Sequence, residues 1–333
     1  MATITVRGPH QYQAQVRRKG YPTQTQTFET KAAAKAWATV IESEMTRAVF
    51  IDRTEAESTT LGDALQRYAQ EVTPHKKSAA NERTMIYRWM RHPLAMRSLA
   101  SLHGADFATY RDERLQEVSA NTVRLDLALI SHVFTIAKKE WNIPVDNPIT
   151  SIRKPKLPPG RDRRLINDEE ARLLKAAADC HSANDGMCTA IVLAIETGMR
   201  AGEIVSLTWQ QIDFSQHIIK LPRTKNGTER VVPLTHAAED MLRKLPRPIN
   251  SSQRLVSFYD TRGMSKAFRL ICADLEIVDL HFHDLRHEAA SRKAPYMQPP
   301  TLAKIMGWKT LQMAMRYYNP SAHELVAAVR AVA

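Results

Sequence analysis

The chain has 333 residues, of which 44% are hydrophobic and 25% charged, and its formal net charge is +12. This much apolar material can form folded cores, so wholesale disorder is excluded, and the length predicts two or three domains. The positive charge indicates attraction to nucleic acid or to an anionic membrane surface, although a basic enzyme with another kind of substrate stays open.

The sequence offers little support for membrane insertion or for a secreted, disulfide-stapled fold. The longest apolar runs, such as residues 188–195, are far shorter than the roughly 20 residues that span a bilayer. The N-terminus lacks the cationic and apolar segments of a signal peptide. The cysteines Cys180, Cys188 and Cys272 form no CxxC pair. We therefore expect a protein of the reducing cytoplasm with no disulfide framework and no zinc site.

Residues 1–55 are predicted to form a small sheet backed by one helix. Residues 12–17 and 23–28 alternate with the period of two that strands show, and residues 29–45 form an alanine-rich helix. We expect a three-stranded sheet, whose polar faces could enter a DNA groove. An ordinary half-exposed sheet explains the same pattern.

Residues 59–152 are predicted to form an all-helical domain. One helix opens at residues 60–65, and residues 121–140 form the clearest helix of the chain. The apolar residues that recur there at helical spacing are Val123, Leu127, Ile130, Phe134 and Ala137. Residues 153–164 then hold three prolines among basic side chains, which predicts an extended spacer. At about 3.3 Å per residue such a spacer reaches roughly 40 Å, enough to join domains on opposite faces of a duplex.

Basic side chains in the helical domain and spacer are candidates for contacts with DNA phosphates. They are Arg83, Arg88, Arg124, Lys154, Lys156 and Arg161. Some alternate with aromatic residues, a pattern that a phosphate-contacting face and an ordinary solvated face both produce. We predict DNA contacts at these positions.

Residues 165–333 are predicted to form a mixed domain of helices around one small sheet. Residues 167–170 look like a capping box that begins a helix, and two helices flank Gly198. Residues 216–221 and 228–234 form a hairpin around an Asn-Gly turn. The chain is thus expected to be mainly α with small β-sheets, an α+β fold.

Two basic residues of this mixed domain are placed where they could approach a phosphate. Arg200 follows the break at Gly198 and starts a new helix, and Lys225 lies at the hairpin tip. A mobile ammonium at a hairpin tip could reach a phosphodiester or a leaving oxygen. Taken singly, each residue is more simply explained as a solvated surface side chain.

Residues 281–287 hold three histidines, one aspartate and one arginine. His283 and His287, at i and i+4, could share a metal ion, but no HExxH or carboxylate-rich pattern accompanies them. On a helix, His283 and Arg286 also face the same way, and arginine supplies a planar donor fork for phosphate oxygens. We favour the phosphate-binding pair over the metal site.

Tyr317 lies nine residues after Trp308 and is followed directly by Tyr318. A tyrosine can pack in a core, donate a hydrogen bond or act as a nucleophile through its phenolic oxygen. Neighbours on a helix point about 100° apart, so only one of the two tyrosines can readily face a site.

Taken in chain order, these patches resemble the active-site signature of the tyrosine recombinases, the phage integrase family. The matching residues are Arg200, Lys225, His283, Arg286, Trp308 and Tyr317. Most members carry histidine at the position of Trp308, and some carry tryptophan. The offset of nine residues selects Tyr317 over Tyr318 as the nucleophile. By this resemblance, residues 1–55 would bind arm sites and residues 59–152 would bind core sites through a SAM-like helical fold. Residues 165–333 would form the catalytic domain.

The resemblance implies a site-specific DNA recombinase or integrase that works through a covalent 3′-phosphotyrosine and a Holliday junction, with no metal, ATP or other cofactor. The implied roles are a phosphate clamp for Arg200 and Arg286, proton acceptor for His283, hydrogen-bond donor for Trp308, general acid for Lys225 and orientation of Arg200 for Glu203.

The implied partners are double-stranded recombination sites, a homotetramer on two such sites, and accessory proteins that bend DNA or set direction. The implied setting is the cytoplasm of a bacterial host, at the nucleoid. Residues 321–332 would pack on a neighbouring protomer or close the core of their own domain.

Three alternatives stay open: a type IB topoisomerase-like enzyme, a regulator that binds DNA without cutting, and a metal-dependent nuclease built on residues 281–287. Residues 160–165 resemble shufflon-type inversion enzymes. The target DNA, and the choice between integration, excision and inversion, cannot be derived from the sequence.

Overall fold

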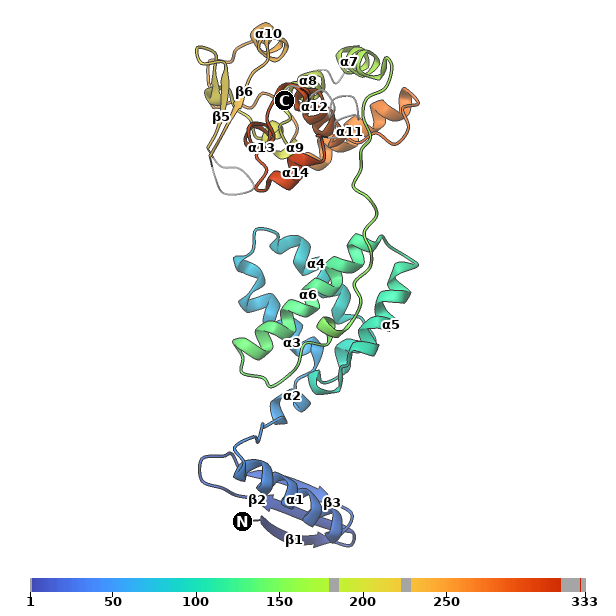
Figure 1. Cartoon of the computed structure of the whole chain (residues 1–333), viewed down its shortest axis with the longest axis vertical. Helices are drawn as coiled ribbons and strands as arrows, with labels where there is room; N and C mark the ends of the chain where they lie inside the picture. Colours follow the sequence, from blue (N-terminus) through green and yellow to red (C-terminus); the bar gives the residue numbers. More distant parts are fainter. Residues whose placement is uncertain (1, 180–185, 223–228, 319–329, 331–333) are drawn as a thin grey trace. The chain divides into compact units, whose positions relative to one another are not determined.

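The computed structural model describes residues 2–179, 186–222, 229–318 and 330, and the chain divides into two compact units, Met1–Pro159 and Gly160–Ala333 (Figure 1). Within the described residues the fold is mainly helical, with two small antiparallel sheets. The expected α+β class is therefore confirmed. Separate hydrophobic clusters form the cores of the sheet module, the helical domain and the second unit.

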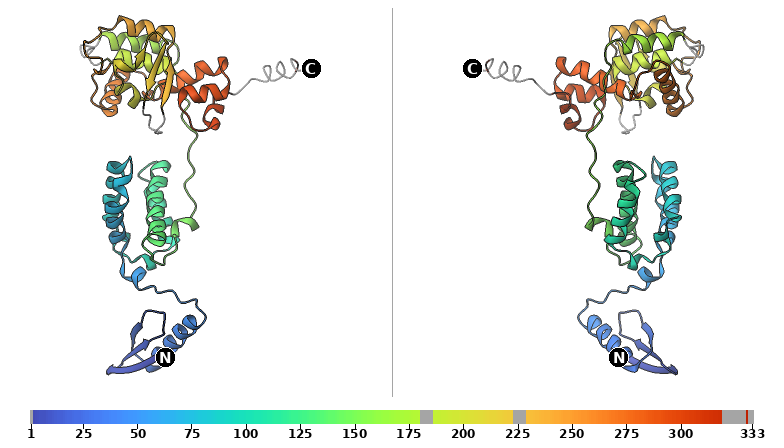
Figure 2. Two further views of the ribbon diagram at one scale, coloured as in Figure 1. Left: turned by 90° about the vertical axis from the view of Figure 1, so that its left-hand side faces the viewer. Right: turned by 90° about the vertical axis from the view of Figure 1, so that its right-hand side faces the viewer.

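The first unit begins with an antiparallel sheet in the order β1-β2-β3, on which one helix packs (Figure 2). The elements are β1 (Ala2–Gly8), β2 (Gln11–Val16), β3 (Gln24–Phe28) and α1 (Lys31–Thr46). Small side chains let α1 approach the sheet closely, since Ala14, Ala34 and Ala38 are all buried. The predicted three-stranded sheet with its helix is confirmed, with boundaries shifted by one or two residues.

Helices make up the rest of the first unit. They are α2 (Thr54–Ser58), α3 (Leu61–Glu71), α4 (Ala79–Met90), α5 (Gly104–Leu115) and α6 (Ala120–Lys139). The side chains of Thr60 and Asp63 form a reciprocal capping box that begins α3. The apolar stripe predicted for α6 is buried at all five positions. Its period of 3.6 residues was therefore enough to identify the core face.

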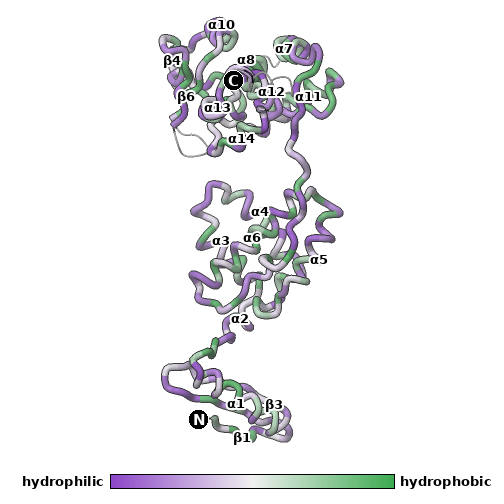
Figure 3. Tube along the Cα trace, in the orientation of Figure 1, coloured by the Kyte–Doolittle hydropathy of each residue, from purple (hydrophilic) through white to green (hydrophobic). Residues whose placement is uncertain are grey.

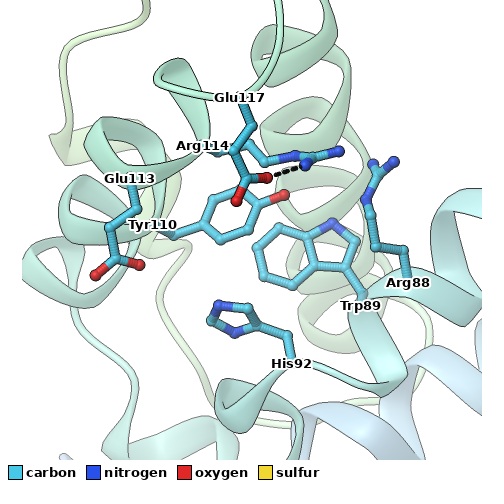
Figure 4. A pocket seen from close by; sticks show the side chains of 7 residues that line it. All are labelled: Arg88, Trp89, His92, Tyr110, Glu113, Arg114 and Glu117. Atoms are coloured by element: carbon cyan, nitrogen blue, oxygen red, sulfur yellow. Dashed lines mark hydrogen bonds and ion pairs between the residues drawn. The ribbon is translucent and has the colours of Figure 1, made fainter.

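A fully buried aspartate of α6 joins three helices of this domain. Asp126 accepts a hydrogen bond from Tyr110 Oη at 2.9 Å, pairs with Arg88, and lies 3.7 Å from Nε of Arg114. Tyr110 also stacks on Trp89, with ring centroids 4.1 Å apart, and these side chains line a hollow of about 170 Å³ (Figure 4). Arg88 is thus paired with an interior carboxylate, and its contact with DNA stays a prediction.

Replacing Asp126 with alanine is expected to destabilise the helical domain by about 3 kcal/mol, the low end for breaking a buried ion pair, because Arg88 keeps partial access to water. Faster hydrogen exchange of the α6 amides would measure this loss. Asp112→Ala is the matched control, since Asp112 is exposed and, among the described residues, forms its ion pair with its neighbour Arg111, and it should leave α6 exchange unchanged. Equal exchange in the two variants would contradict the role of Asp126.

Residues 153–166 form no helix or strand, as the spacer prediction requires. The end of this segment, however, is attached to the second unit by ion pairs. These join Arg161 to Asp279 and Asp284, Arg163 to Glu169, and Arg164 to Glu288. Arg161, predicted to contact DNA, binds two carboxylates in this structure, and its contact with DNA stays a prediction. The attachment leaves residues 153–159 as the spacer proper.

The second unit is built around α8, which contacts α7, α9, α10 and α12. Its helices are α7 (Glu169–Asp179), α8 (Met187–Thr197), α9 (Ala201–Val205), α10 (His236–Lys244), α11 (Thr261–Asp274), α12 (Asp284–Lys293), α13 (Pro299–Met306) and α14 (Leu311–Met315). Its sheet consists of β4 (Ile212–Asp213), β5 (Ile218–Leu221) and β6 (Arg230–Pro233). The antiparallel pairing of β5 with β6 confirms the predicted hairpin, whose tip lies outside the described residues.

Hydrophobic and hydrophilic residues alternate along most of the traced chain (Figure 3). Accordingly, among the helices that the structure describes, none combines the length and the apolar character needed to cross a membrane.

Candidate active site

Two glycines allow the ends of α8 and α13 to meet. Gly198 follows α8 with a φ of +66°, and Gly307 follows α13 with a φ of +63°, a region where side chains with a Cβ are strained. A Cβ on Gly198 would lie 2.6 Å from Sδ of Met306, and one on Gly307 would lie 2.7 Å from Cδ of Arg230. The backbone of both turns is therefore open to close approach by neighbouring side chains.

Arg200 begins α9 and is held by two partners. Its Nη1 donates to Oε1 of Glu203 at 2.9 Å, and its Nη2 donates to the carbonyl of Gly307 at 2.8 Å. The other carboxylate oxygen of Glu203 accepts the backbone N–H of Arg200 at 2.8 Å. Glu203 thus makes the orienting contact expected of it.

Arg286 lies in the first turn of α12 and is only 4% exposed. It donates to the carbonyls of Gly198 and Met306. Burial, together with the positive charges of Arg200 and Arg230, lowers the pKa of Arg286 to about 9, so its guanidinium stays protonated at neutral pH. Arg200 and Arg286 therefore bind consecutive carbonyls at the end of α13 and place two cations side by side.

Arg230 is a third guanidinium of this site, to which the sequence analysis assigned no role. It lies on β6, is 6% exposed, and donates from Nη2 to Oε2 of Glu203 at 2.7 Å. Its Nε and Nη1 are buried with no hydrogen-bond acceptor among the described residues. Arg230 and Val232 are buried and alternate with exposed neighbours on β6, but the Arg-Val-Val-Pro sequence of this strand carries no polar alternation that could have shown it.

The two consecutive tyrosines have different partners. The ring of Tyr317 stacks on Trp308, with centroids 5.3 Å apart and planes at 8°, and its Oη is hydrogen-bonded to Nδ1 of His287. Burial raises the pKa of Tyr317, so the hydroxyl keeps its proton at neutral pH. Tyr318 donates instead to the carbonyl of Met297 at 2.5 Å. Only Tyr317 therefore presents its oxygen to a histidine of the 281–287 patch.

The histidines of residues 281–287 have different partners, although His283 and His287 touch each other. His283 is exposed just before α12, and its ring meets the ring of His287 edge-on at 5.3 Å. His281 lies 3.5 Å from the carboxylate of Asp284, which Arg161 also binds. In the part of the chain that the structure describes, no three or more His, Cys, Asp or Glu side chains form a group that could hold a metal ion.

The other predicted site residues are distributed over the chain. Lys225 lies outside the described residues, as do residues 321–329 and 331–332 of the C-terminal segment. Arg124 and Lys154 line a common hollow of about 250 Å³ in the helical domain. Arg83 and Lys156 are exposed. The structure thus brings together five of the six predicted catalytic residues in the second unit: Arg200, His283, Arg286, Trp308 and Tyr317.

Comparison with known proteins identifies relatives of this chain. The model of the phage integrase family matches residues 163–324. A shufflon-specific DNA recombinase of Escherichia coli is 39% identical over 277 residues, which are 80% of this chain and 71% of that protein. A Haemophilus influenzae protein described as an integrase or recombinase is 36% identical over 341 residues, covering 97% of this chain and 89% of the relative.

Solved structures share the fold at low sequence identity. A λ integrase dimer bound to a COC′ core site has a TM-score of 0.67 and 20% identity, covering 95% of this chain and 94% of that one. The Tn1549 transposon integrase, in complex with a circular intermediate DNA, has a TM-score of 0.67 and 16% identity, covering 82% and 99%. From its relatives, its family match and its fold, this chain belongs to the phage integrase family, the tyrosine site-specific recombinases.

Proposed function

We propose that this recombinase cleaves and rejoins DNA through a covalent 3′-phosphotyrosine on Tyr317, without a metal ion or ATP. The observation that carries the proposal is that two fixed arginines bind the backbone directly before Trp308, the residue whose ring stacks on Tyr317. Arg200 and Arg286 bind the carbonyls of Gly307 and Met306, and Trp308, the next residue, stacks on Tyr317. A nucleophile beside a preorganised cationic clamp is the arrangement that phosphoryl transfer needs.

In the cleavage step, Oη of Tyr317 attacks the scissile phosphorus and the 5′ oxygen leaves. The phosphotyrosine retains the energy of the phosphodiester, so rejoining needs no nucleotide. Arg200 and Arg286 stabilise the charge that develops on the non-bridging oxygens, since each guanidinium has donors beyond those that bind carbonyls. Lys225 protonates the leaving 5′ oxygen in this scheme. A 5′-hydroxyl of the partner duplex then attacks the phosphotyrosine and completes the exchange.

Two supporting side chains complete the site. Trp308 holds the ring of Tyr317 by stacking, in addition to the hydrogen bond expected from its indole N–H. His283 binds a phosphate oxygen in this scheme; it is exposed just before α12, and its ring contacts that of His287, which in turn contacts Tyr317. Glu203 keeps Arg200 in position.

We assign the assembly by the same reasoning. Four protomers act on two double-stranded sites through a Holliday junction, and a λ integrase tetramer of the same fold has been solved bound to a Holliday junction, with a TM-score of 0.62 and 20% identity. Residues 1–55 serve as the arm-binding module and residues 59–152 as the core-binding domain, with Arg83, Arg124, Lys154 and Lys156 as phosphate contacts. The reaction takes place at the nucleoid, in the bacterial cytoplasm, with accessory proteins that bend DNA or set direction.

A nicked suicide substrate tests this function. Repeats in the DNA that flanks the gene supply candidate sites, and the nick lets the short cleaved strand diffuse away, so the phosphotyrosine accumulates. We expect an SDS-resistant protein–DNA adduct that forms at the same rate with and without EDTA.

Each alternative predicts a different result on the same gel. A metal-dependent nuclease gives free ends that EDTA abolishes, and a regulator gives a bound complex that SDS dissolves. A topoisomerase forms the adduct equally well on DNA without the repeats. Any of these three results would contradict the recombinase assignment of this site.

A further inference from the structure

His287 is a titratable side chain of the active site to which the proposed function gives no task. It lies on α12, directly after Arg286, and is partly buried. Its Nδ1 is hydrogen-bonded to Oη of Tyr317, and the two rings lie 6.1 Å apart with planes at 29°. We propose that His287, rather than His283, accepts the proton of Tyr317 when the tyrosine attacks DNA, and returns it on rejoining. This inference rests on Tyr317 being the nucleophile.

The stacking of the site explains why Oη stays at His287. Trp308 lies nearly parallel to the Tyr317 ring, with planes at 8°, and limits its rotation. The backbone N–H of Tyr317 donates to the carbonyl of Ala314 at 2.9 Å, which holds the residue at the end of α14. His283 meets the ring of His287 edge-on. The order of contacts is therefore Tyr317, His287, His283, and the histidine that touches the reacting oxygen is His287.

The charges around His287 favour its neutral form. Burial is the main cause, and His283, Arg316 and Arg286 add positive charge, against which Asp284 is the opposing carboxylate. Together they lower the pKa of His287 to about 4, so its imidazole has a free lone pair at neutral pH. Tyr317, whose pKa is raised by burial, supplies the proton. With its remaining proton on Nε2, the neutral imidazole accepts at Nδ1 from the hydroxyl, which is the polarity that a proton acceptor needs.

The chemical step balances with these groups. The bond between Oη and phosphorus forms, the bond between phosphorus and the 5′ oxygen breaks, and the proton of Oη moves to Nδ1 of His287. The phenolic oxygen becomes strongly acidic as it bonds to phosphorus, so a weakly basic imidazole suffices when transfer accompanies attack. A separate acid, Lys225 in the proposed scheme, protonates the 5′ oxygen. On rejoining, Oη leaves phosphorus and takes the proton back from His287.

Three variants of the full chain separate a proton acceptor from a positioning group. His287→Ala removes both functions. His287→Asn keeps an acceptor oxygen near the place of Nδ1 but cannot hold a proton. His283→Asn is the matched change at the rival histidine. Single-turnover adduct formation on the suicide substrate is followed for each between about pH 6 and about pH 8, below the pKa of Arg286.

We expect both His287 variants to cleave about 10²-fold more slowly than the parent near neutral pH, the usual size of a general-base effect. Their rates should rise with pH as Tyr317 begins to ionise unaided, while the parent stays flat in this range. In the parent, the imidazole of His287 is neutral throughout this range of pH. It would take up a proton, and so stop accepting one from Tyr317, only as the pH falls through its pKa of about 4. His283→Asn should keep the flat profile.

Two results would overturn the inference. If His287→Asn cleaves like the parent, His287 only positions the tyrosine. If His283→Asn shows the rising profile while the His287 variants stay flat, His283 is the acceptor. A 5′-bridging phosphorothiolate substrate tests whether His287 is instead the general acid, because its sulfur leaves without a proton. We expect this substrate not to restore the cleavage rate of the His287 variants. If the parent itself forms no adduct, the proposed function has failed, whereas parent-like rates in both His287 variants refute this inference alone.

Discussion

Tyr317→Phe is expected to abolish the covalent adduct on the nicked suicide substrate. The substitution removes only Oη, so the ring can still stack on Trp308 as it does in the parent, with centroids 5.3 Å apart. No other group then forms the bond to phosphorus, so the loss is complete rather than partial. SDS gels with end-labelled DNA measure it, and a gel-shift assay of DNA binding checks that the variant still folds.

Tyr318→Phe is the matched control for this change. It removes the same atom one residue later, where the hydroxyl donates to the carbonyl of Met297. Losing that hydrogen bond should cost about 1 kcal/mol of stability, with adduct formation unchanged. If the adduct persists in Tyr317→Phe, or if it vanishes in Tyr318→Phe, Tyr317 is not the nucleophile.

Arg286→Lys is expected to slow cleavage by about 10²- to 10³-fold, the loss seen when one donor to a developing oxyanion is removed. Lysine keeps the positive charge but lacks the planar fork with which Arg286 reaches the carbonyls of Gly198 and Met306. A point charge on a flexible stem cannot bind both carbonyls and also present a fixed donor to phosphate. The rate of adduct formation at saturating protein reports the effect on the chemical step.

Arg292→Lys provides the control on the same helix. Arg292 also lies on α12, but it pairs with Glu170 and Glu288. Its replacement keeps the charge and leaves the site untouched, so cleavage should stay within about twofold of the parent, the small effect expected away from special contacts. Equal losses in Arg286→Lys and Arg292→Lys would show that the helix, not the guanidinium of Arg286, is responsible.

Local patterns in the sequence were sufficient for most elements, whereas the candidate catalytic residues were assigned by resemblance to a family. The helix predicted at residues 121–140 matches α6 to within one residue at each end, because nine buried positions of one helix produce a strong 3.6-residue period. The hairpin of β5 and β6 followed from an Asn-Gly turn between alternating residues. The spacing of Trp308 and Tyr317 likewise singled out one tyrosine, and the structure gives that residue its own partner.

Charge pairing was decided only by the tertiary structure. Arg88 and Arg161 are basic residues in a basic chain, yet one meets Asp126, 38 residues away, and the other meets Asp284, 123 residues away. No local signal distinguishes an arginine bound to such a distant carboxylate from one that awaits a phosphate. The same limit explains why Arg230, buried against Glu203, received no role from the sequence.

The sequence by itself determined which residue types make the site, because their order and spacing are properties of the chain. It did not determine which histidine meets Tyr317. The spacing put His283 and His287 on one helical face, and the resemblance implied His283 as the proton acceptor. The packing of α12 against the end of α14, with Trp308 stacked on the tyrosine, brings Oη to Nδ1 of His287. A hydrogen bond depends on positions within a fraction of an ångström, which only the packed fold defines.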